Sequence, residues 1–439
     1  MTVIPEAVNK LLNKYDLKRI CTPETIINYD DSIADRFWDA GLEMAVDVGI
    51  ICTSTERIIQ LSREEVLFGL REAVDYLRVG TGLDARDWKP RMPEGRHKPM
   101  TILGAFGAVT DEDLYIPMTQ SACQYRSVDA TVVGTLATVN GKELRSGTPH
   151  ETLGGAHESK LVKEAMSRAG RPGMGVLTIS TAPTEFGLFG GLDIPEGLSV
   201  GQALVSCNMP SELKTDYHSL QKLAASIIHR APAACAHWTM IGGYSGTPEG
   251  CAITAIASAI LGSLVMKAHT VFCATLDLRY LGNTGADALW ASSVVYQAVS
   301  RNTHLLTRYP INPVSGPLTD MLLREVTVGA INGAVSGATA VQGIRTTGGK
   351  FPLRATGLES GYAGEVVKAS AGMTREEGNE IIKQILPKYE DQLKRPPIGV
   401  TFPECFDLKT VKPTKEWEDI YKRIKKEVVE LGVPLPPFE

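Results

Sequence analysis

The chain has 439 residues, of which 43% are hydrophobic and 22% charged, so it is long enough to bury a large core and has an ordinary globular composition. Its 45 basic and 50 acidic side chains give a net charge of −5, which excludes a binder of the nucleic-acid backbone. The N-terminal residues lack the pattern of a signal peptide, and no apolar run reaches the roughly 18 residues that span a bilayer. We therefore expect a cytoplasmic protein with no membrane partner.

A capped helix precedes the main pattern of the chain. Ser62 and Glu65 have the spacing of a helix capping box, and apolar residues follow at helical intervals as far as Leu77. After this helix, short apolar runs alternate with longer helical segments. The seven predicted strands are 101–106, 130–136, 175–181, 233–238, 271–278, 305–309 and 338–344. The predicted helices between them include 158–169, 211–230, 247–267, 286–301 and 317–335.

Apolar strands that alternate with helices of this length predict a parallel sheet buried on both faces. We predict an α/β fold, a single (β/α)8 TIM barrel with N- and C-terminal helical extensions, with an open doubly wound sheet as the alternative. The expected parts are a helical extension over 1–98, the barrel core over 99–372 and C-terminal helices over 373–439. The eighth strand is expected either within 343–358 or before residue 100.

The local motifs exclude several kinds of enzyme. The chain has no P-loop, HExxH or GxSxG string, so the usual markers of nucleotide cleavage, zinc proteolysis and α/β-hydrolase chemistry are missing. Its eight cysteines include no CxxC pair, and we expect them to be reduced. The glycine run at 242–250 suits either an anion site at a helix start or a structural turn.

In a TIM barrel the catalytic groups lie at the carboxyl ends of the strands. Asp216 and His237 are separated by 20 residues, and the predicted pattern brings both to that end. A carboxylate and an imidazole there suit a metal ion or acid–base chemistry. A third ligand would come from Glu185, Glu196, Asp193 or Cys207. The alternative interpretation is an aspartate that begins a helix and a hydrogen-bonded core histidine.

Several long strings resemble the monomethylamine:corrinoid protein methyltransferase family. They are AGRPGMGV at 169–176, GGYSG at 242–246, VGTGLDA at 79–85 and FPECFDLKTVKPTKEW at 402–417. The similarity extends over nearly the whole chain. It implies a (β/α)8 barrel, a homo-oligomer, and transfer of a methyl group to the Co(I) of a separate corrinoid protein. No DxHxxG signature is present, so we expect the corrinoid to be carried by that partner and not bound permanently.

The chain also departs from the family pattern. The amine-using members have pyrrolysine directly after GMGV, where this chain has Leu177. The family's glutamates and glutamine around the methylamine adduct fall at Ser206, Ala236 and Pro310. A free amine leaves badly, and Leu177 supplies no electrophile to activate it. The resemblance therefore implies another donor, and an aryl methyl ether is suitable because a phenolate has a conjugate-acid pKa of about 10.

Ether-cleaving relatives, as the resemblance implies, carry zinc on two carboxylates and a histidine. Asp216 and His237 match the spacing of the last two, but Gly201 occupies the place of the first carboxylate. We expect Asp216, His237 and Glu185 as catalytic residues, and the zinc ligands Asp216, His237 and Glu196. The substrate, a small methylated aromatic compound, is expected to contact Leu177, Trp238 and Tyr244.

Two other functions remain open at this point. In the first alternative, the methyl donor is a methylamine, a quaternary amine or a methyl thioether. In the second alternative the barrel has lost its chemistry and only docks the corrinoid protein as a scaffold.

Overall fold

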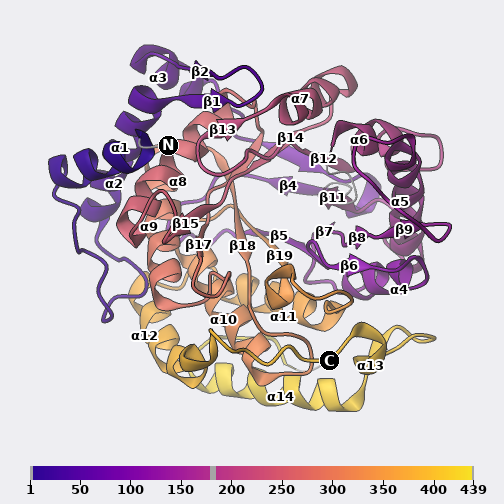
Figure 1. Cartoon of the computed structure of the whole chain (residues 1–439). Coiled ribbons are helices and arrows are strands. Elements are labelled where there is room, and N and C mark those ends of the chain that lie inside the picture. Colours follow the sequence, from indigo (N-terminus) through magenta and orange to yellow (C-terminus); the bar gives the residue numbers. More distant parts are fainter. Residues whose placement is uncertain (1–2, 178–183, 438–439) are drawn as a thin grey trace.

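A closed barrel of eight parallel strands occupies the centre of the molecule (Figure 1). The computed structural model describes residues 3–177 and 184–437. The strands follow one another around the barrel in chain order, and β19 pairs with β5 to close it. They are β5 (Met100–Leu103), β7 (Ala130–Val132), β11 (Gly175–Leu177), β12 (Ala203–Ser206), β14 (Ala233–Ala236), β16 (Thr270–Phe272), β18 (Leu306–Ile311) and β19 (Ala340–Ile344). The predicted (β/α)8 barrel is confirmed.

Helices cover the outside of the barrel, as expected for strands that are apolar on both faces. Those between the barrel strands are α4 (Glu112–Cys123), α5 (Pro149–Arg168), α6 (Glu185–Gly191), α7 (Tyr217–His229), α8 (Pro248–Leu264), α9 (Ala286–Asn302) and α10 (Asp320–Val335), and α11 (Gly357–Ala369) follows β19. Short strands extend the connections: β6 (Val109–Thr110), β8 (Thr135–Leu136), β9 (Thr138–Val139), β10 (Lys142–Glu143), β13 (Lys214–Thr215), β15 (Thr239–Ile241) and β17 (Thr275–Asp277).

The eighth strand is β12, so both expected positions for it were wrong. β12 has only four residues and follows α6, which has seven, so no long helix marks the unit in the sequence. The region 343–358 holds the end of β19, the 3-10 turn η2 (Thr346–Gly349) and the start of α11 instead. Part of the predicted third strand, 178–181, lies outside the described residues.

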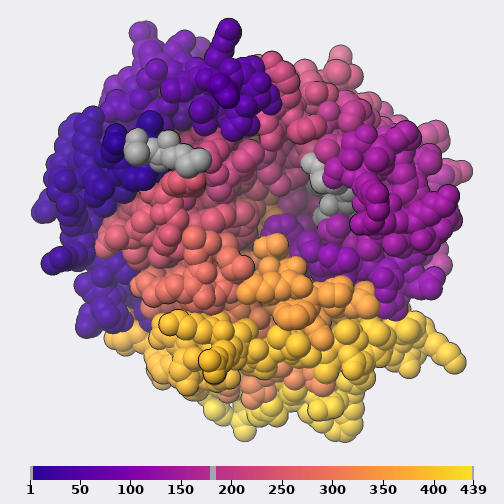
Figure 2. All heavy atoms as spheres, viewed as in Figure 1, coloured from indigo at the N-terminus to yellow at the C-terminus, as the bar shows by residue number. Residues whose placement is uncertain are grey.

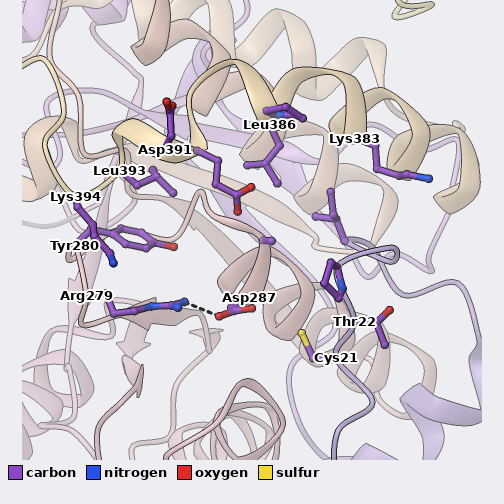
Figure 3. A pocket seen from close by; sticks show the side chains of 15 residues that line it. Cys21, Thr22, Arg279, Tyr280, Asp287, Lys383, Leu386, Asp391, Leu393 and Lys394 are labelled. Carbon is purple, nitrogen blue, oxygen red and sulfur yellow. Dashed lines mark hydrogen bonds and ion pairs between the residues drawn. The ribbon is translucent and has the colours of Figure 1, made fainter.

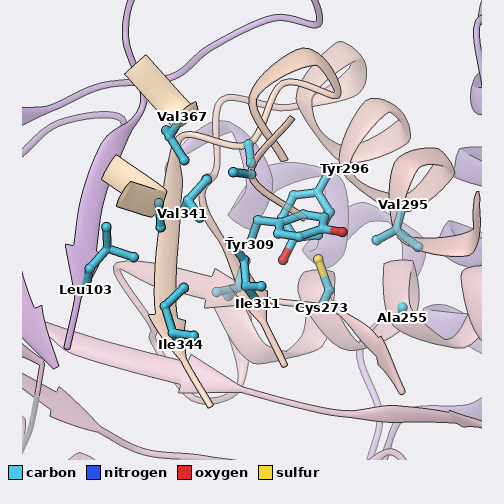
Figure 4. Close-up of a cluster of buried hydrophobic side chains, with 14 of the residues drawn as sticks. Leu103, Ala255, Cys273, Val295, Tyr296, Tyr309, Ile311, Val341, Ile344 and Val367 are labelled. Carbon is cyan, nitrogen blue, oxygen red and sulfur yellow. The ribbon is translucent and has the colours of Figure 1, made fainter. Parts of the chain in front are cut away.

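Side chains alternate between the two faces of each barrel strand. Figure 4 shows the outward layer, in which Tyr309, Ile311 and Cys273 pack toward Val295 and Tyr296 of α9. The residues between them therefore point inward. The inward apolar cluster contains Met100, Ile102, Ala130, Val132, Leu177, Leu204, Ala234, Leu306 and Ala340.

The N-terminal extension is not wholly helical, contrary to expectation. It comprises α1 (Val3–Lys14), α2 (Asp31–Val48), β1 (Ile50–Cys52), β2 (Arg57–Ile59), α3 (Arg63–Arg71), β3 (Leu77–Val79), η1 (Gly82–Asp84) and β4 (Arg86–Trp88). The capping box of Ser62 and Glu65 is present, but its helix ends at Arg71. Leu77, the expected helix end, begins the hairpin β3–β4. Leu77, Val79 and Trp88 of this hairpin join the inward cluster beside the first residues of the barrel strands.

The C-terminal segment forms a layer against the barrel helix α10 (Figure 1). It comprises α12 (Arg375–Ile385), η3 (Leu386–Lys388), η4 (Glu390–Gln392), α13 (Phe402–Cys405), β20 (Phe406–Asp407), β21 (Lys412–Pro413) and α14 (Lys415–Glu430). The two predicted helices correspond to α12 and α14. Among the described residues, every helix is too short or too polar to cross a membrane.

Candidate functional site

Aromatic side chains line the mouth of the barrel at the carboxyl ends of its strands. Figure 2 shows this face of the molecule hollowed at its centre, where Figure 1 places the strands. Phe106, Trp238 and Phe272 form one cluster there with Ala236 and Ala274. The rings of Trp238 and Phe272 meet edge to face with centroids 4.9 Å apart. The mouth therefore offers an apolar, aromatic wall to a small molecule.

The three residues expected to contact substrate do not form one site. Leu177 lies inside the barrel with 4% of its surface exposed, and Trp238 lies at the mouth above this layer. Tyr244 instead lines a separate apolar groove with Ile51 and Ile58 of the N-terminal extension. The ammonium group of Lys214 lies 5.1 Å from the centroid of the Tyr244 ring. Leu177 and Trp238 thus belong to the barrel interior, and Tyr244 does not.

A buried arginine, Arg308, points into the barrel from β18, because its neighbour Tyr309 points outward. One guanidinium nitrogen donates to the side-chain oxygen of Gln342, and another donates to the carbonyl of Cys235 at 2.6 Å. The guanidinium carbon lies 5.5 Å from the centroid of the Phe272 ring. Burial lowers the pKa of Arg308 to about 10. Nothing in the sequence around Arg308 marks it as inward-facing, so it could not be selected as a site residue from the sequence.

A second arginine, Arg345, lies at the rim of the mouth after β19. A Cβ atom built on Gly107, the residue after Phe106, would lie 3.7 Å from its Nε, and one built on Gly349 would lie 2.6 Å from it. Gly349 therefore leaves room that this side chain occupies, whereas Gly107 is at an ordinary contact distance from it. Burial lowers the pKa of Arg345. Within the residues that the structure describes, its side chain has neither a hydrogen bond nor an ion pair.

The expected pair of Asp216 and His237 is not brought together by the described contacts. Asp216 caps α7, where its carboxylate accepts a hydrogen bond from the Ser219 amide at 2.7 Å. His237 is buried on the other face of the strand from Trp238, and its Nε2 accepts from the Leu213 amide at 3.2 Å. Burial, together with the charge of Lys214, lowers the pKa of His237 to about 3. Both residues thus match the alternative interpretation, a helix cap and a core histidine.

The expected zinc ligands do not fit a metal ion in this arrangement. Glu196 is exposed and pairs with Lys160 at 2.6 Å. Over 3–177 and 184–437, no three side chains among the histidines, cysteines and acids converge as a metal site would require. The ligand set Asp216, His237 and Glu196 is therefore spread over separate contacts, and we derive no step through zinc.

A different histidine pairs with the third expected catalytic residue. Glu185 begins α6 and is buried, and its carboxylate lies 2.8 Å from Nδ1 of His218 at the start of α7. This contact raises the pKa of His218, and the charge of Asp216 acts in the same direction. Burial lowers the pKa of the nearby Lys222, although Glu185 and Asp216 act against this effect. We call Glu185, Asp216, His218 and Lys222 the polar cluster.

The polar cluster lies at the carboxyl end of the barrel, because α6 and α7 begin where the connections from β11 and β12 end. Both of its carboxylates are among the residues predicted from the sequence, but His218, which is two residues after Asp216, is not. The signal that identifies it is its position in the first turn of a helix that follows a barrel strand.

Arg279, which follows the strand end at Asp277, lines another cavity. Arg279 pairs with Asp277. It also pairs with Asp287 of α9 (Figure 3). The cavity has a volume of about 760 Å³ and lies between the N-terminal extension and the C-terminal layer, where Cys21 and Lys383 line it. The charge of Arg279 is therefore already balanced by acids.

A closed barrel with an aromatic and basic mouth defines a (β/α)8 enzyme that acts on a small molecule. A family model described as monomethylamine methyltransferase MtmB matches residues 1–433. The chain belongs to this family and is a methyltransferase.

Relatives and solved structures agree with this assignment. Monomethylamine methyltransferase MtmB of Methanosarcina mazei is 29% identical over 445 residues, which cover 98% of this chain and 93% of the relative. MtmB2 of Methanosarcina barkeri is 29% identical over 435 residues, with the same coverage. The crystal structure of the Methanosarcina barkeri monomethylamine methyltransferase superposes with a TM-score of 0.94 at 28% identity, again over 98% and 93% of the two chains. A hydroxylamine complex of MtmB gives 0.93 at 29% identity over the same shares.

Proposed function

We propose that the protein transfers a methyl group from a quaternary amine to the Co(I) of a partner corrinoid protein. Membership of the MtmB family supports a methylated amine as the class of donor. The observation that selects a quaternary amine is the aromatic wall of Phe106, Trp238 and Phe272 above an apolar layer that contains Leu177. We also propose that the protein works as a homo-oligomer.

The leaving group explains the choice of a quaternary amine. Cleavage of a methyl–nitrogen bond leaves the electron pair on nitrogen, so a free methylamine would have to leave as a strongly basic anion. A quaternary nitrogen already carries a positive charge and leaves as a neutral tertiary amine. The electron pair of Co(I) forms the new bond to the methyl carbon, and the product is methyl-Co(III). No electrophile is then needed at Leu177.

The side chains at the mouth would bind and orient such a donor. Aromatic rings attract a cationic ammonium group through their negative faces, by about 0.5–2 kcal/mol per contact depending on desolvation. Trp238 is only partly buried, so its ring is open to a ligand, and Phe272 fixes its orientation through the edge-to-face contact. The aromatic cluster would thus hold the ammonium at the mouth, where the methyl group faces an approaching corrinoid.

An aryl methyl ether is the second candidate, supported by the same apolar and aromatic lining. Its phenolate leaves with a conjugate-acid pKa of about 10 and gains from a proton. The raised pKa of His218 favours a protonated imidazole in the polar cluster at the same end of the barrel. This candidate therefore requires the polar cluster, whereas a quaternary amine does not.

The test supplies the partner corrinoid protein in its Co(I) form and follows the absorbance change to methyl-Co(III). The donors are a quaternary amine, methylamine, 4-methoxybenzoate and dimethyl sulfide. We expect methylation from the quaternary amine, and a loss of at least ten-fold in kcat/KM for Trp238→Leu. The control Phe68→Leu, at an exposed ring on α3, should leave the rate unchanged. Methylation only from methylamine or only from the ether would contradict the proposal.

A further inference from the structure

The barrel contains positive charge that no acid in the described structure balances. Arg308 points into the interior and Arg345 lies at the rim beside Phe106 and Gly107. No carboxylate contributes to the pKa of either arginine, and neither forms an ion pair within 3–177 and 184–437. The residues 178–183 outside those ranges have the sequence TISTAP, which includes no acid. A buried charge without a counter-ion costs several kcal/mol, so its retention needs an explanation.

Arg91 shows how this fold holds a buried arginine for structural reasons alone. Its guanidinium donates to the carbonyls of His97, Gly95, Ala334 and Ala338, so all three of its nitrogens have acceptors. Arg308 has two such bonds, and its buried Nε has no partner among the described residues. Arg308 is therefore incompletely satisfied where Arg91 is complete.

The polar partners of Arg308 also differ from those of the paired arginines at the strand ends. Arg279 contacts two carboxylates, and Arg171 contacts Asp84 at 3.2 Å. Arg91 has no acid either, but carbonyl oxygens satisfy all three of its nitrogens. Among the described residues, Arg308 keeps a buried Nε without a partner, and the side chain of Arg345 has no partner at all. The barrel interior and its mouth therefore hold positive charge that lacks both an acid and a full set of acceptors.

The barrel mouth contains both aromatic rings, which attract a cation, and guanidinium groups without an acid, which attract an anion. A ligand that carries both charges would fit this combination. The rings of Trp238 and Phe106 favour a cation, while Arg345 and the field of Arg308 disfavour one unless an anion accompanies it. We propose that the methyl donor carries a carboxylate, which binds Arg345 above the buried charge of Arg308. The donor is then a zwitterion, a quaternary amine with a carboxylate on a short linker. The quaternary amine of this donor rests on the proposed function, whereas its carboxylate rests on the two arginines.

The experiment measures binding by calorimetry with two pairs of probes that need no corrinoid protein. Trimethylglycine and choline share a quaternary ammonium, and only the first has a carboxylate. 4-Methoxybenzoate and 4-methoxybenzyl alcohol are the corresponding ether pair. We expect trimethylglycine to bind at least ten-fold more tightly than choline.

Variants then locate the carboxylate. Arg345→Gln should weaken trimethylglycine binding at least ten-fold and change choline binding less than two-fold, and Arg345→Lys should restore part of the loss. Arg308→Lys keeps the buried charge and should retain the preference for the acid. Arg168→Gln is the matched control, because Arg168 is exposed on α5 and, among the residues that the structure describes, its side chain pairs with Glu164 alone.

The outcomes separate the inference from the proposed function. Choline binding as tightly as trimethylglycine would overturn the inference. So would the absence of binding by either acid at 10 mM, a concentration roughly ten-fold above a Kd of about 1 mM. An unchanged preference in Arg345→Gln would overturn it as well. Tight binding of 4-methoxybenzoate with no binding of trimethylglycine would support the carboxylate and overturn the quaternary amine.

Discussion

Glu185 and His218 meet between α6 and α7, with the carboxylate 2.8 Å from the imidazole Nδ1. The glutamate side chain is 3% exposed and the histidine 61%, so a buried anion orients an accessible ring. An ionised carboxylate only accepts hydrogen bonds, so Nδ1 carries the proton in this contact and the tautomer of the neutral ring has its lone pair on Nε2. This is the arrangement by which a carboxylate fixes the tautomer of a catalytic histidine.

Replacement of Glu185 should lower the pKa of His218. The native contact raises that pKa, so the Glu185→Gln variant should titrate His218 nearer to the ordinary value of 6.5. The stabilising effect of the pair is fully present below pH 6.5 and is lost as the pH rises through the raised pKa. Histidine NMR titration of the two proteins measures the shift. An identical His218 pKa in both would show that the ion pair does not form in solution.

His237 should make the fold sensitive to acid. Its pKa is about 3 in the folded chain, so the unfolded chain binds the extra proton between pH 6.5 and 3. The free energy of unfolding should then decrease as the pH falls through this window, by at most about 1.4 kcal/mol per pH unit. His237→Gln keeps an acceptor for the Leu213 amide and should flatten this dependence. His218→Gln is the control, since its effect lies at higher pH, and an equal slope in both variants would contradict the assignment.

Leu177→Ala should destabilise the protein by about 2–5 kcal/mol, because it opens a cavity inside the barrel. The native side chain is 4% exposed among Ile102, Val132 and Leu204. Denaturant unfolding followed by circular dichroism measures the loss. Leu67→Ala, at a position 40% exposed on α3, is the matched control and should cost much less. A cost below about 1 kcal/mol at Leu177 would instead indicate that the side chain borders an open pocket.

Zinc should not copurify with the protein at one ion per chain. Asp216, His237 and Glu196 have separate contacts, so His237→Ala should leave the metal content of the purified protein unchanged. Atomic emission on both proteins after dialysis gives the comparison. One zinc ion per chain in the native protein, lost in the variant, would show that these side chains converge when metal binds.

The barrel could be predicted from the sequence because most of its strands are short, mainly apolar runs and long helices separate most of them. The unit around β12 could not be predicted, because a four-residue strand after a seven-residue helix is too short to show a clear hydrophobic periodicity. His237 was predicted as a site residue from its position alone, because it follows the end of a barrel strand. Successive side chains along a strand point to opposite faces. Trp238 therefore faces the barrel mouth, whereas His237 faces away from it and contacts the Leu213 amide.

The charged part of the site was missed for a related reason. Asp216 and Glu185 are acids whose place at the carboxyl end of the barrel could be predicted. Their partner His218 could not, because its position depends on the residue at which α7 begins. Arg308 is one residue before an outward tyrosine, and only the packing of Tyr309 against Tyr296 shows which way it faces. The proposed carboxylate on the donor therefore depends on contacts that no motif in the sequence marks.

The hairpin β3–β4 covers the amino end of the barrel, where Leu77, Val79 and Trp88 join the inward apolar cluster. Trp88 seals the amino end, where its indole nitrogen donates to the Thr339 hydroxyl at 2.8 Å and only 1% of its surface is exposed. Under the proposed function, the donor, the demethylated product and the corrinoid protein would all use the carboxyl mouth of the barrel. The small molecule would then have to bind before the partner covers it, and turnover would wait for the partner to leave.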